Sequence, residues 1–202
     1  MISGVYADAF TEVHGAQPKL TVRKAVMRDI PLILDLINGY AARGIMLART
    51  EFELSEAIRD FSVVKSGDTL LGCGALHFYT PTIGEIRSLA VDEKAKTKGV
   101  GRLLVEALVQ EALVYELDAV FAFTYVVEFF SRVGFHAVER GALPLKAWKD
   151  CVRCPKFQAC DEVAVLRVLR PERGVESEPQ FWAESVRTPD DQLIQIPIPR
   201  AE

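Results

Sequence analysis

The segment that most constrains the fold lies in the middle of the chain, over residues 84–108, and reads GEIRSLAVDEKAKTKGVGRLLVEAL. Its pattern predicts a strand over 85–91, a turn over 94–101 and an amphipathic helix from 99 to about 117. Apolar residues of the helix recur at the spacing of one buried face: Val100, Leu103, Leu104, Ala107 and Leu108. A strand joined to a helix by a short turn is a basic unit of α/β folds.

The turn carries two glycines where the helix begins, Gly99 and Gly101, with Lys96, Lys98 and Arg102 around them. A helix start offers unpaired backbone N–H groups and the positive end of the helix dipole to an anion. The segment therefore predicts a cradle for a phosphate or pyrophosphate, and a solvated lysine-rich turn is the alternative. Its spacing matches neither a P-loop nor a dinucleotide-binding fingerprint.

Length and composition indicate one globular domain. The chain has 202 residues, of which 50% are hydrophobic and 26% charged, and its net charge of −4 argues against nucleic acid as the main partner. It lacks a secretion-signal pattern and any long uncharged apolar run, so we expect a cytoplasmic protein that does not enter a membrane. We predict an extension over 1–19, a domain over 20–170, and an acidic, proline-rich tail over 171–202.

The order of predicted elements is β-α-α-β-β-β-α-β-α-β-loop-β. Thr50 and Glu53 form a capping-box pattern at the start of the second helix. Expected strands cover 20–26, 61–65, 69–78, 85–91, 119–124, 135–139 and 162–168. Expected helices cover 30–41, 51–59, 99–117 and 128–133, with a further short one at 144–149. The fold class is therefore α/β, with a central mixed sheet of six to seven strands flanked by helices.

The sequence Lys96-x-x-Gly99-x-Gly101, after a strand that ends in Leu-Ala-Val, resembles the acetyl-coenzyme A binding motif of the GNAT acetyltransferases. Lysine replaces the usual Arg or Gln at the first position. A second segment, residues 128–135, is similar to the late helix of that family, which commonly reads Phe-Tyr-x-x-x-Gly-Phe. The resemblance spans residues 20–168 and implies the GNAT fold with acetyl-CoA as co-substrate. The residues that it implies for the cofactor are Leu89, Ala90, Val91, Lys96, Lys98, Gly99, Val100, Gly101, Arg102 and Phe130.

More narrowly, residues 40–49, 73–76 and 85–91 resemble the acetyltransferase part of N-acetylglutamate synthases, without the upstream amino-acid-kinase domain of longer members. This resemblance implies direct acetyl transfer, in a ternary complex, to the α-amino group of an amino acid. The substrate that it implies is L-glutamate, as in the first step of arginine biosynthesis. The sequence departs from the synthase pattern at the end of the fifth strand. Synthases often carry Arg and Ser there after a Thr-Thr pair, whereas Thr124 is followed by Tyr-Val-Val.

The resemblance also implies catalytic roles. Glu85, at the start of the central strand, falls where the family places a carboxylate base, and the backbone of Leu89 or Ala90 where it places an oxyanion donor. Phe130 stands where many members carry a tyrosine that protonates the thiolate. Tyr125 is the nearest tyrosine in the sequence and is our candidate for that acid, with an aromatic anchor as the alternative.

An acidic substrate requires cations for its carboxylates. Arg49 matches the arginine that holds the substrate carboxylate in the synthase group. Arg87 shares a strand face with Glu85, since the two are separated by one residue, and a surface cross-strand ion pair is the alternative. Lys24, on the first predicted strand, is a third candidate.

Three further residues, Cys151, Cys154 and Cys160, are close enough in the sequence to hold zinc or iron. The alternative is a loop with free or redox-labile thiols. Cys73 lies in an apolar strand and is expected to be a small core residue.

Two alternative functions remain open from the sequence. One is a GNAT enzyme for another amine, such as aspartate, a polyamine, an antibiotic or a protein N-terminus. The other is a non-catalytic acyl-CoA sensor with a cysteine-rich metal or redox loop. The predicted fold is compatible with a homodimer.

Overall fold

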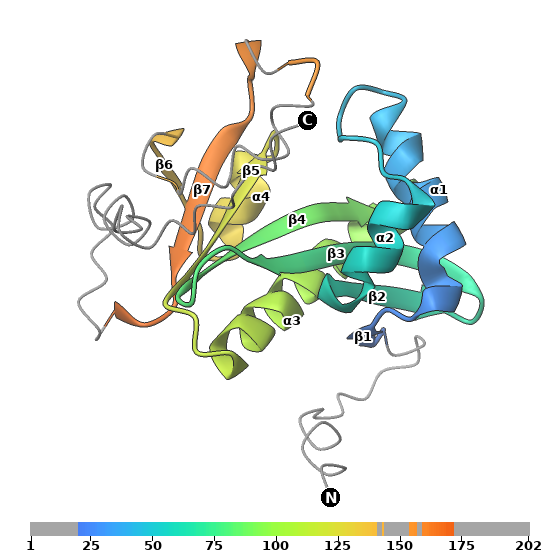
Figure 1. Ribbon diagram of the computed structural model, residues 1–202, viewed down its shortest axis with the longest axis horizontal. Coiled ribbons are helices and arrows are strands. Elements are labelled where there is room, and N and C mark those ends of the chain that lie inside the picture. Colours follow the sequence, from blue (N-terminus) through green and yellow to red (C-terminus); the bar gives the residue numbers. More distant parts are fainter. Residues whose placement is uncertain (1–19, 141–142, 144–153, 157–158, 172–202) are drawn as a thin grey trace, which may run out of the picture.

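The computed structural model describes residues 20–140, 143, 154–156 and 159–171. One seven-stranded sheet forms its centre, with the strand order β1-β2-β3-β4-β5-β7-β6 (Figure 1). The strands are β1 Val22–Lys24, β2 Phe61–Ser66, β3 Thr69–Phe78, β4 Ile83–Val91, β5 Ala119–Thr124, β6 His136–Val138 and β7 Val163–Val168. The helices are η1 Met27–Asp29, α1 Ile30–Ala41, α2 Glu51–Ala57, η2 Ile58–Asp60, η3 Glu93–Lys98, α3 Val100–Val114 and α4 Val127–Arg132.

The predicted element order and the mixed sheet are confirmed. The capping box is also present, since the Thr50 side chain accepts from the Glu53 backbone N–H and the Glu53 carboxylate accepts from Thr50 N at 2.8 Å. Most bounds agree with the prediction to within two residues. β1 is shorter than residues 20–26, and α3 ends at Val114, shortly before Glu116 adopts a φ of +60°. The predicted turn before α3 is a 3₁₀ helix, η3, and the predicted helix at 144–149 lies outside the described residues.

Helices cover both faces of the sheet. α1 and α2 pack on one face against Phe61, Cys73 and Ala75. α3 and α4 pack on the other face, where Leu76 and Ile86 contribute to the same cluster. Cys73 is fully buried, which raises the pKa of its thiol to about 12 and confirms it as a core residue.

The sheet is antiparallel except between β4 and β5, which run parallel. These two strands pair over three residues of each, ending at Glu85 opposite Phe121, and then diverge (Figure 1). β4 continues for six residues beyond Glu85, to Val91. Because β5 turns away, the part of β4 after Glu85 has, among the described residues, no strand partner on the side that faces β5.

Candidate active site

Four titratable side chains gather around the point where β4 and β5 part. Glu85 is 8% exposed and lies directly opposite His77 of β3. The His77 Nδ1 atom is 2.8 Å from Asp60 Oδ2, and Arg87 Nη2 is 4.0 Å from the same oxygen. Strand alternation places Glu85, Arg87 and His77 on the face that α1 and α2 cover. The structure thus brings the predicted base and one predicted substrate cation together.

A β-bulge interrupts β4 immediately after Arg87. Ala75 pairs with Arg87 and Cys73 with Ala90, so two residues, Ser88 and Leu89, oppose Gly74. Ser88 has a φ of +53°, a left-handed conformation that costs a non-glycine residue about 1–3 kcal/mol and that occurs often at functional sites. A bulge leaves the extra residue outside the hydrogen-bond ladder. The bulge therefore interrupts the regular pairing of β4 with β3 at the part of β4 that borders the opening.

The glycine-rich turn forms the expected helix start. Gly99 has a φ of +76° and caps α3, whose first residue is Val100. At Gly101 a Cβ atom would lie 3.3 Å from Phe129 Cζ, so the aromatic ring of α4 closes over the glycine. The helix start therefore presents its N–H groups next to an apolar wall, a geometry that suits a phosphate followed by an apolar chain.

Some cations of this turn are paired with acids in the structure. Lys96 Nζ is 2.8 Å from Glu93 Oε2, and Arg102 Nε is 2.6 Å from Glu106 Oε1. Hydrogen bonds from Lys96 and Arg43 lower the pKa of Glu93 to about 2. All four side chains are well exposed, so an incoming phosphate can replace the carboxylates at low cost.

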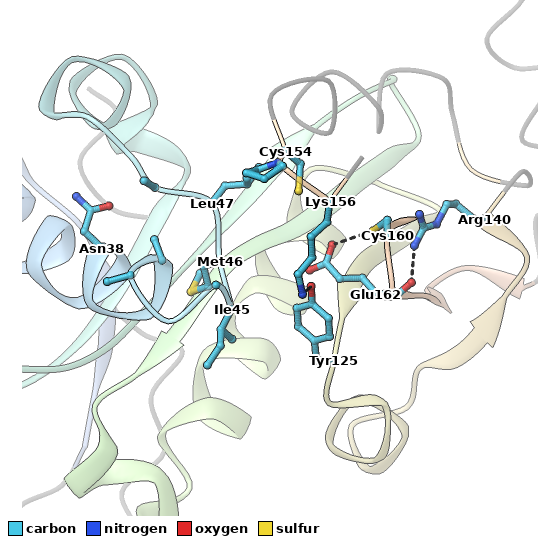
Figure 2. Close-up of a pocket in the computed structure, with 15 residues that line it drawn as sticks. Asn38, Ile45, Met46, Leu47, Tyr125, Arg140, Cys154, Lys156, Cys160 and Glu162 are labelled. Carbon is cyan, nitrogen blue, oxygen red and sulfur yellow. Dashed lines mark hydrogen bonds between the residues drawn. The ribbon is translucent and has the colours of Figure 1, made fainter. Parts of the chain in front are cut away.

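A cavity of about 700 Å³ lies between the α1–α2 loop and the segment before β7 (Figure 2). One wall is apolar and consists of Ile45, Met46, Leu47 and Ala48. The other wall carries polar and ionisable side chains: Tyr125, Arg140, Cys154, Lys156, Cys160 and Glu162. The dimensions and the mixed lining are those of a small-molecule site.

The polar wall is organised around Tyr125, at the end of β5. Its hydroxyl donates to Asp161 Oδ1 at 2.9 Å and accepts from Lys156 Nζ at 3.1 Å. Burial raises the pKa of Tyr125, and its phenol is therefore protonated at neutral pH. Burial likewise raises the pKa of Glu162, whose Oε2 is 4.0 Å from Cys160 Sγ.

The remaining predicted residues lie in different places. Arg49 is half-buried in the α1–α2 loop, where its backbone N–H and carbonyl are both bonded to the Asn38 side chain, at 2.9 and 3.0 Å. Lys24 forms an ion pair with Glu111 of α3 at 2.8 Å, and its Nζ also donates to the backbone carbonyl of Asp60 at 3.2 Å. Phe130 is 3% exposed and packs edge-to-face between Phe129 and Phe135 in the core.

The metal prediction is tested for part of its residues. Cys151 lies outside the described residues, whereas Cys154 and Cys160 both line the cavity. Among the described residues there is no group of three His, Cys, Asp or Glu side chains that could hold a metal ion. Within the same residues, no helix has the length and apolar character to cross a membrane.

Comparison with known proteins identifies the family. The model of the acetyltransferase (GNAT) family matches residues 39–135. An uncharacterized N-acetyltransferase of Chlorobaculum tepidum is 44% identical over 150 residues, which are 73% of this chain and 96% of that protein. The chain belongs to the GNAT acetyltransferase family. The predicted fold and the predicted acetyl-CoA-dependent acetyltransferase are confirmed at this level.

Other relatives within the GNAT family are amino-acid acetyltransferases. The one from Mycobacterium tuberculosis is 39% identical over 65% of this chain and 77% of that protein. A crystal structure from the same organism, in complex with CoA, has a TM-score of 0.64 and 32% identity over 74% of this chain and 99% of that one. The N-acetylglutamate synthase of Neisseria gonorrhoeae, complexed with coenzyme A and N-acetyl-glutamate, has a TM-score of 0.69 and 28% identity; the match covers 76% of this chain but 36% of that one.

Sequence reasoning missed two components of the site. Lys156 stands between the cysteines and has no spacing signal of its own, and it reaches Tyr125 across 31 residues of sequence. Asp60 ends the 3₁₀ turn before β2, and its contact with His77 depends on the hairpin register. Neither pairing could be read from a local pattern.

Proposed function

We propose that this GNAT enzyme transfers the acetyl group of acetyl-CoA to the α-amino group of an amino acid, with L-glutamate as the preferred acceptor. The observation that carries the proposal is Glu85, a carboxylate that is 8% exposed at the residue where β4 and β5 part. The amino-acid acetyltransferases among the relatives support the acceptor class. On this proposal the protein would catalyse the first step of arginine biosynthesis.

The proposed reaction is direct, in a ternary complex. Glu85 takes a proton from the α-ammonium group, and the free amine attacks the thioester carbon. A backbone N–H of Leu89 or Ala90, beside the bulge, stabilises the oxyanion. The C–S bond then breaks, the Tyr125 hydroxyl gives its proton to the thiolate, and the second proton that the acetylated nitrogen loses restores the Tyr125 phenol. Phe130 has no part in this step, because its ring is in the core.

The pyrophosphate of acetyl-CoA is proposed to bind at the start of α3. Backbone N–H groups of residues 99–102 would hold it, and Lys96, Lys98 and Arg102 would add charge. The side chain of Val100 is fully buried and anchors this turn to the sheet. Leu89, Ala90 and Val91 would line the pantetheine along the open edge of β4.

The acceptor is proposed to bind in the cavity between the α1–α2 loop and Tyr125. Arg87 and Arg49 are the proposed cations for its carboxylates, and Lys156 is a further candidate from the cavity wall. Lys24 is left out, since Glu111 already holds it.

A neutral amino acid is a second candidate acceptor. Lys156 is hydrogen-bonded to Asp161 at 3.3 Å, Glu162 adds a second carboxyl group to the wall, and the facing wall is apolar. These features suit an acidic side chain less well than a neutral one.

The experiment is thiol release from acetyl-CoA, measured against a panel of amino acids and other amines with the full chain. We expect release that needs both acetyl-CoA and an amino acid. Glu85→Gln should lower kcat by about 100-fold or more while CoA affinity is kept, as expected for a general base. Glu116→Gln, at an exposed residue after α3, is the matched control. Full activity of Glu85→Gln at every pH would refute the base assignment, and CoA binding without turnover on any amine would favour a sensor.

A further inference from the structure

We propose that His77, oriented by Asp60, carries the proton that Glu85 removes from the acceptor out to solvent. This inference rests on the proposed function and adds a second group to its proton path. It assigns a role to the Asp60–His77 pair, which the steps described above do not use.

The chemistry requires such a path. An ammonium and a thioester give an amide, a thiol and one released proton. Glu85 receives that proton but is 8% exposed, so its contact with bulk water is small. The carboxylate must lose the proton before another turnover can begin. A half-exposed group next to Glu85 would shorten the route to solvent.

The register of the sheet puts His77 in that place. β3 and β4 are antiparallel, and His77 is directly opposite Glu85. Directly opposite residues share a face, with Cβ atoms roughly 4.5–5.5 Å apart. The His77 side chain is 33% exposed, so the pair connects a buried carboxylate to a group that water reaches.

Asp60 fixes the orientation of the imidazole. Its Oδ2 atom is 2.8 Å from Nδ1 of His77. We assign the Nδ1 proton as donated to this carboxylate, which leaves Nε2 as the acceptor. The rings of His77 and Tyr79 also pack in a T-shaped arrangement, with 5.2 Å between their centroids, which helps to hold the imidazole.

The charges around His77 can be counted for the two positions of the proton. The Lys24–Glu111 ion pair reaches Asp60 through the Asp60 backbone carbonyl, which is 3.2 Å from Lys24 Nζ, and is neutral as a pair. The ionisable groups next to His77 itself are Asp60 from η2, Glu85 and Arg87 from β4, and Tyr79, which follows β3. With a neutral imidazole and both carboxylates ionised, these groups carry a net −1. After Glu85 has passed its proton to Nε2, the group as a whole is neutral. Asp60 then stabilises the imidazolium until it releases the proton to water and the cycle is complete.

The test uses steady-state kinetics of the full-length enzyme with rising concentrations of free imidazole. We expect His77→Gln to lower kcat by about tenfold, within the range of a single proton-transfer group. The KM values of both substrates should change little, and free imidazole should restore kcat. Asp60→Asn should lower kcat by a smaller factor than His77→Gln does. His136→Gln, at an exposed histidine on β6, is the control and should behave as wild type.

Rescue separates a relay from a structural role, since imidazole cannot repair a misfolded site. An unchanged kcat in His77→Gln would overturn the proposal. So would a loss that imidazole does not restore in a variant with the wild-type melting temperature and CoA affinity. If Glu85→Gln is impaired and His77→Gln is not, the relay is wrong and the proposed function stands. Absence of turnover by the wild type on any amine would instead refute the proposed function itself.

Discussion

Replacement of Asp29 by Asn tests how the first strand is held to the first helix. The carboxylate is fully buried and accepts two hydrogen bonds from Arg23, at 2.7 and 2.8 Å, and one from the backbone N–H of Val26 at 2.9 Å. The hydrogen bonds from Arg23 are the main reason why the pKa of Asp29 falls from 3.8 to about 2. Asparagine keeps the shape of the side chain and removes its charge.

The magnitude follows from the pKa difference between the folded and unfolded states. A decrease from 3.8 to about 2 corresponds to about 2.5 kcal/mol of folding free energy at pH 7. Arg23 is 41% exposed, so screening by water reduces the expected loss in Asp29→Asn to about 1–2 kcal/mol. Because the folded pKa is the lower one, this stability is fully present above about pH 5. It is lost as the pH falls toward 2.

The assay is urea unfolding of wild type and Asp29→Asn at pH 7, 5, 4 and 3. The difference in unfolding free energy should stay constant down to pH 5 and fall to about half of its neutral value at pH 3. Asp68→Asn, in the exposed turn between β2 and β3, is the matched control and should change stability by less than about 0.5 kcal/mol. A difference that does not depend on pH would show that the ionised carboxylate is not the cause, and the reasoning would be refuted.

Three further predictions concern the site. Gly101→Val should raise the KM for acetyl-CoA by about tenfold, or about 1.4 kcal/mol, because the new Cβ would lie 3.3 Å from Phe129. Initial rates at varied acetyl-CoA check this, and Gly39→Ala is the control, since a Cβ at Gly39 meets open space. Tyr125→Phe should lower kcat by at least about tenfold with little change in KM, and an unchanged kcat would exclude the phenol as the acid. Alkylation of Cys160 by iodoacetamide, followed by mass spectrometry, should slow when the acceptor amino acid is bound. If alkylation is equally fast with and without the acceptor, the cavity is excluded as the binding site of the acceptor.

The elements that were predicted to the residue are those with strong local signals. α1, Ile30–Ala41, has a clear apolar period and a proline in its first turn, and β5, Ala119–Thr124, is a compact apolar run. The ends of other elements depend on contacts that a local pattern does not contain. α3 stops at Val114, and the buried Leu117 that extended the apparent period belongs to the turn after it.

The site was predicted in part for the same reason. That Glu85 and Arg87 share a face follows from the alternation of one strand, the role of Glu85 was implied by the family resemblance, and the glycine-flanked helix start follows from one short segment. For Lys24, strand alternation does not say which side chain its ammonium meets. Its ion pair with Glu111 spans 87 residues of sequence and becomes visible in the folded chain. The groups around Tyr125 also depend on such distant pairings.

The bulge at Ser88 explains how one strand can serve both halves of the proposed reaction. Uninterrupted alternation from Glu85 would put Leu89 on the α1 and α2 face and Ala90 on the α3 face. The structure has the reverse, because Leu89 packs over Gly74 beside Leu108 of α3, and Ala90 joins the cluster of α1. Glu85 and Arg87, before the bulge, therefore lie on the face that α1 and α2 cover, whereas Leu89 after it turns toward α3, the glycine-capped helix. A one-residue insertion exchanges the two faces at the point where an acetyl group would have to pass between them.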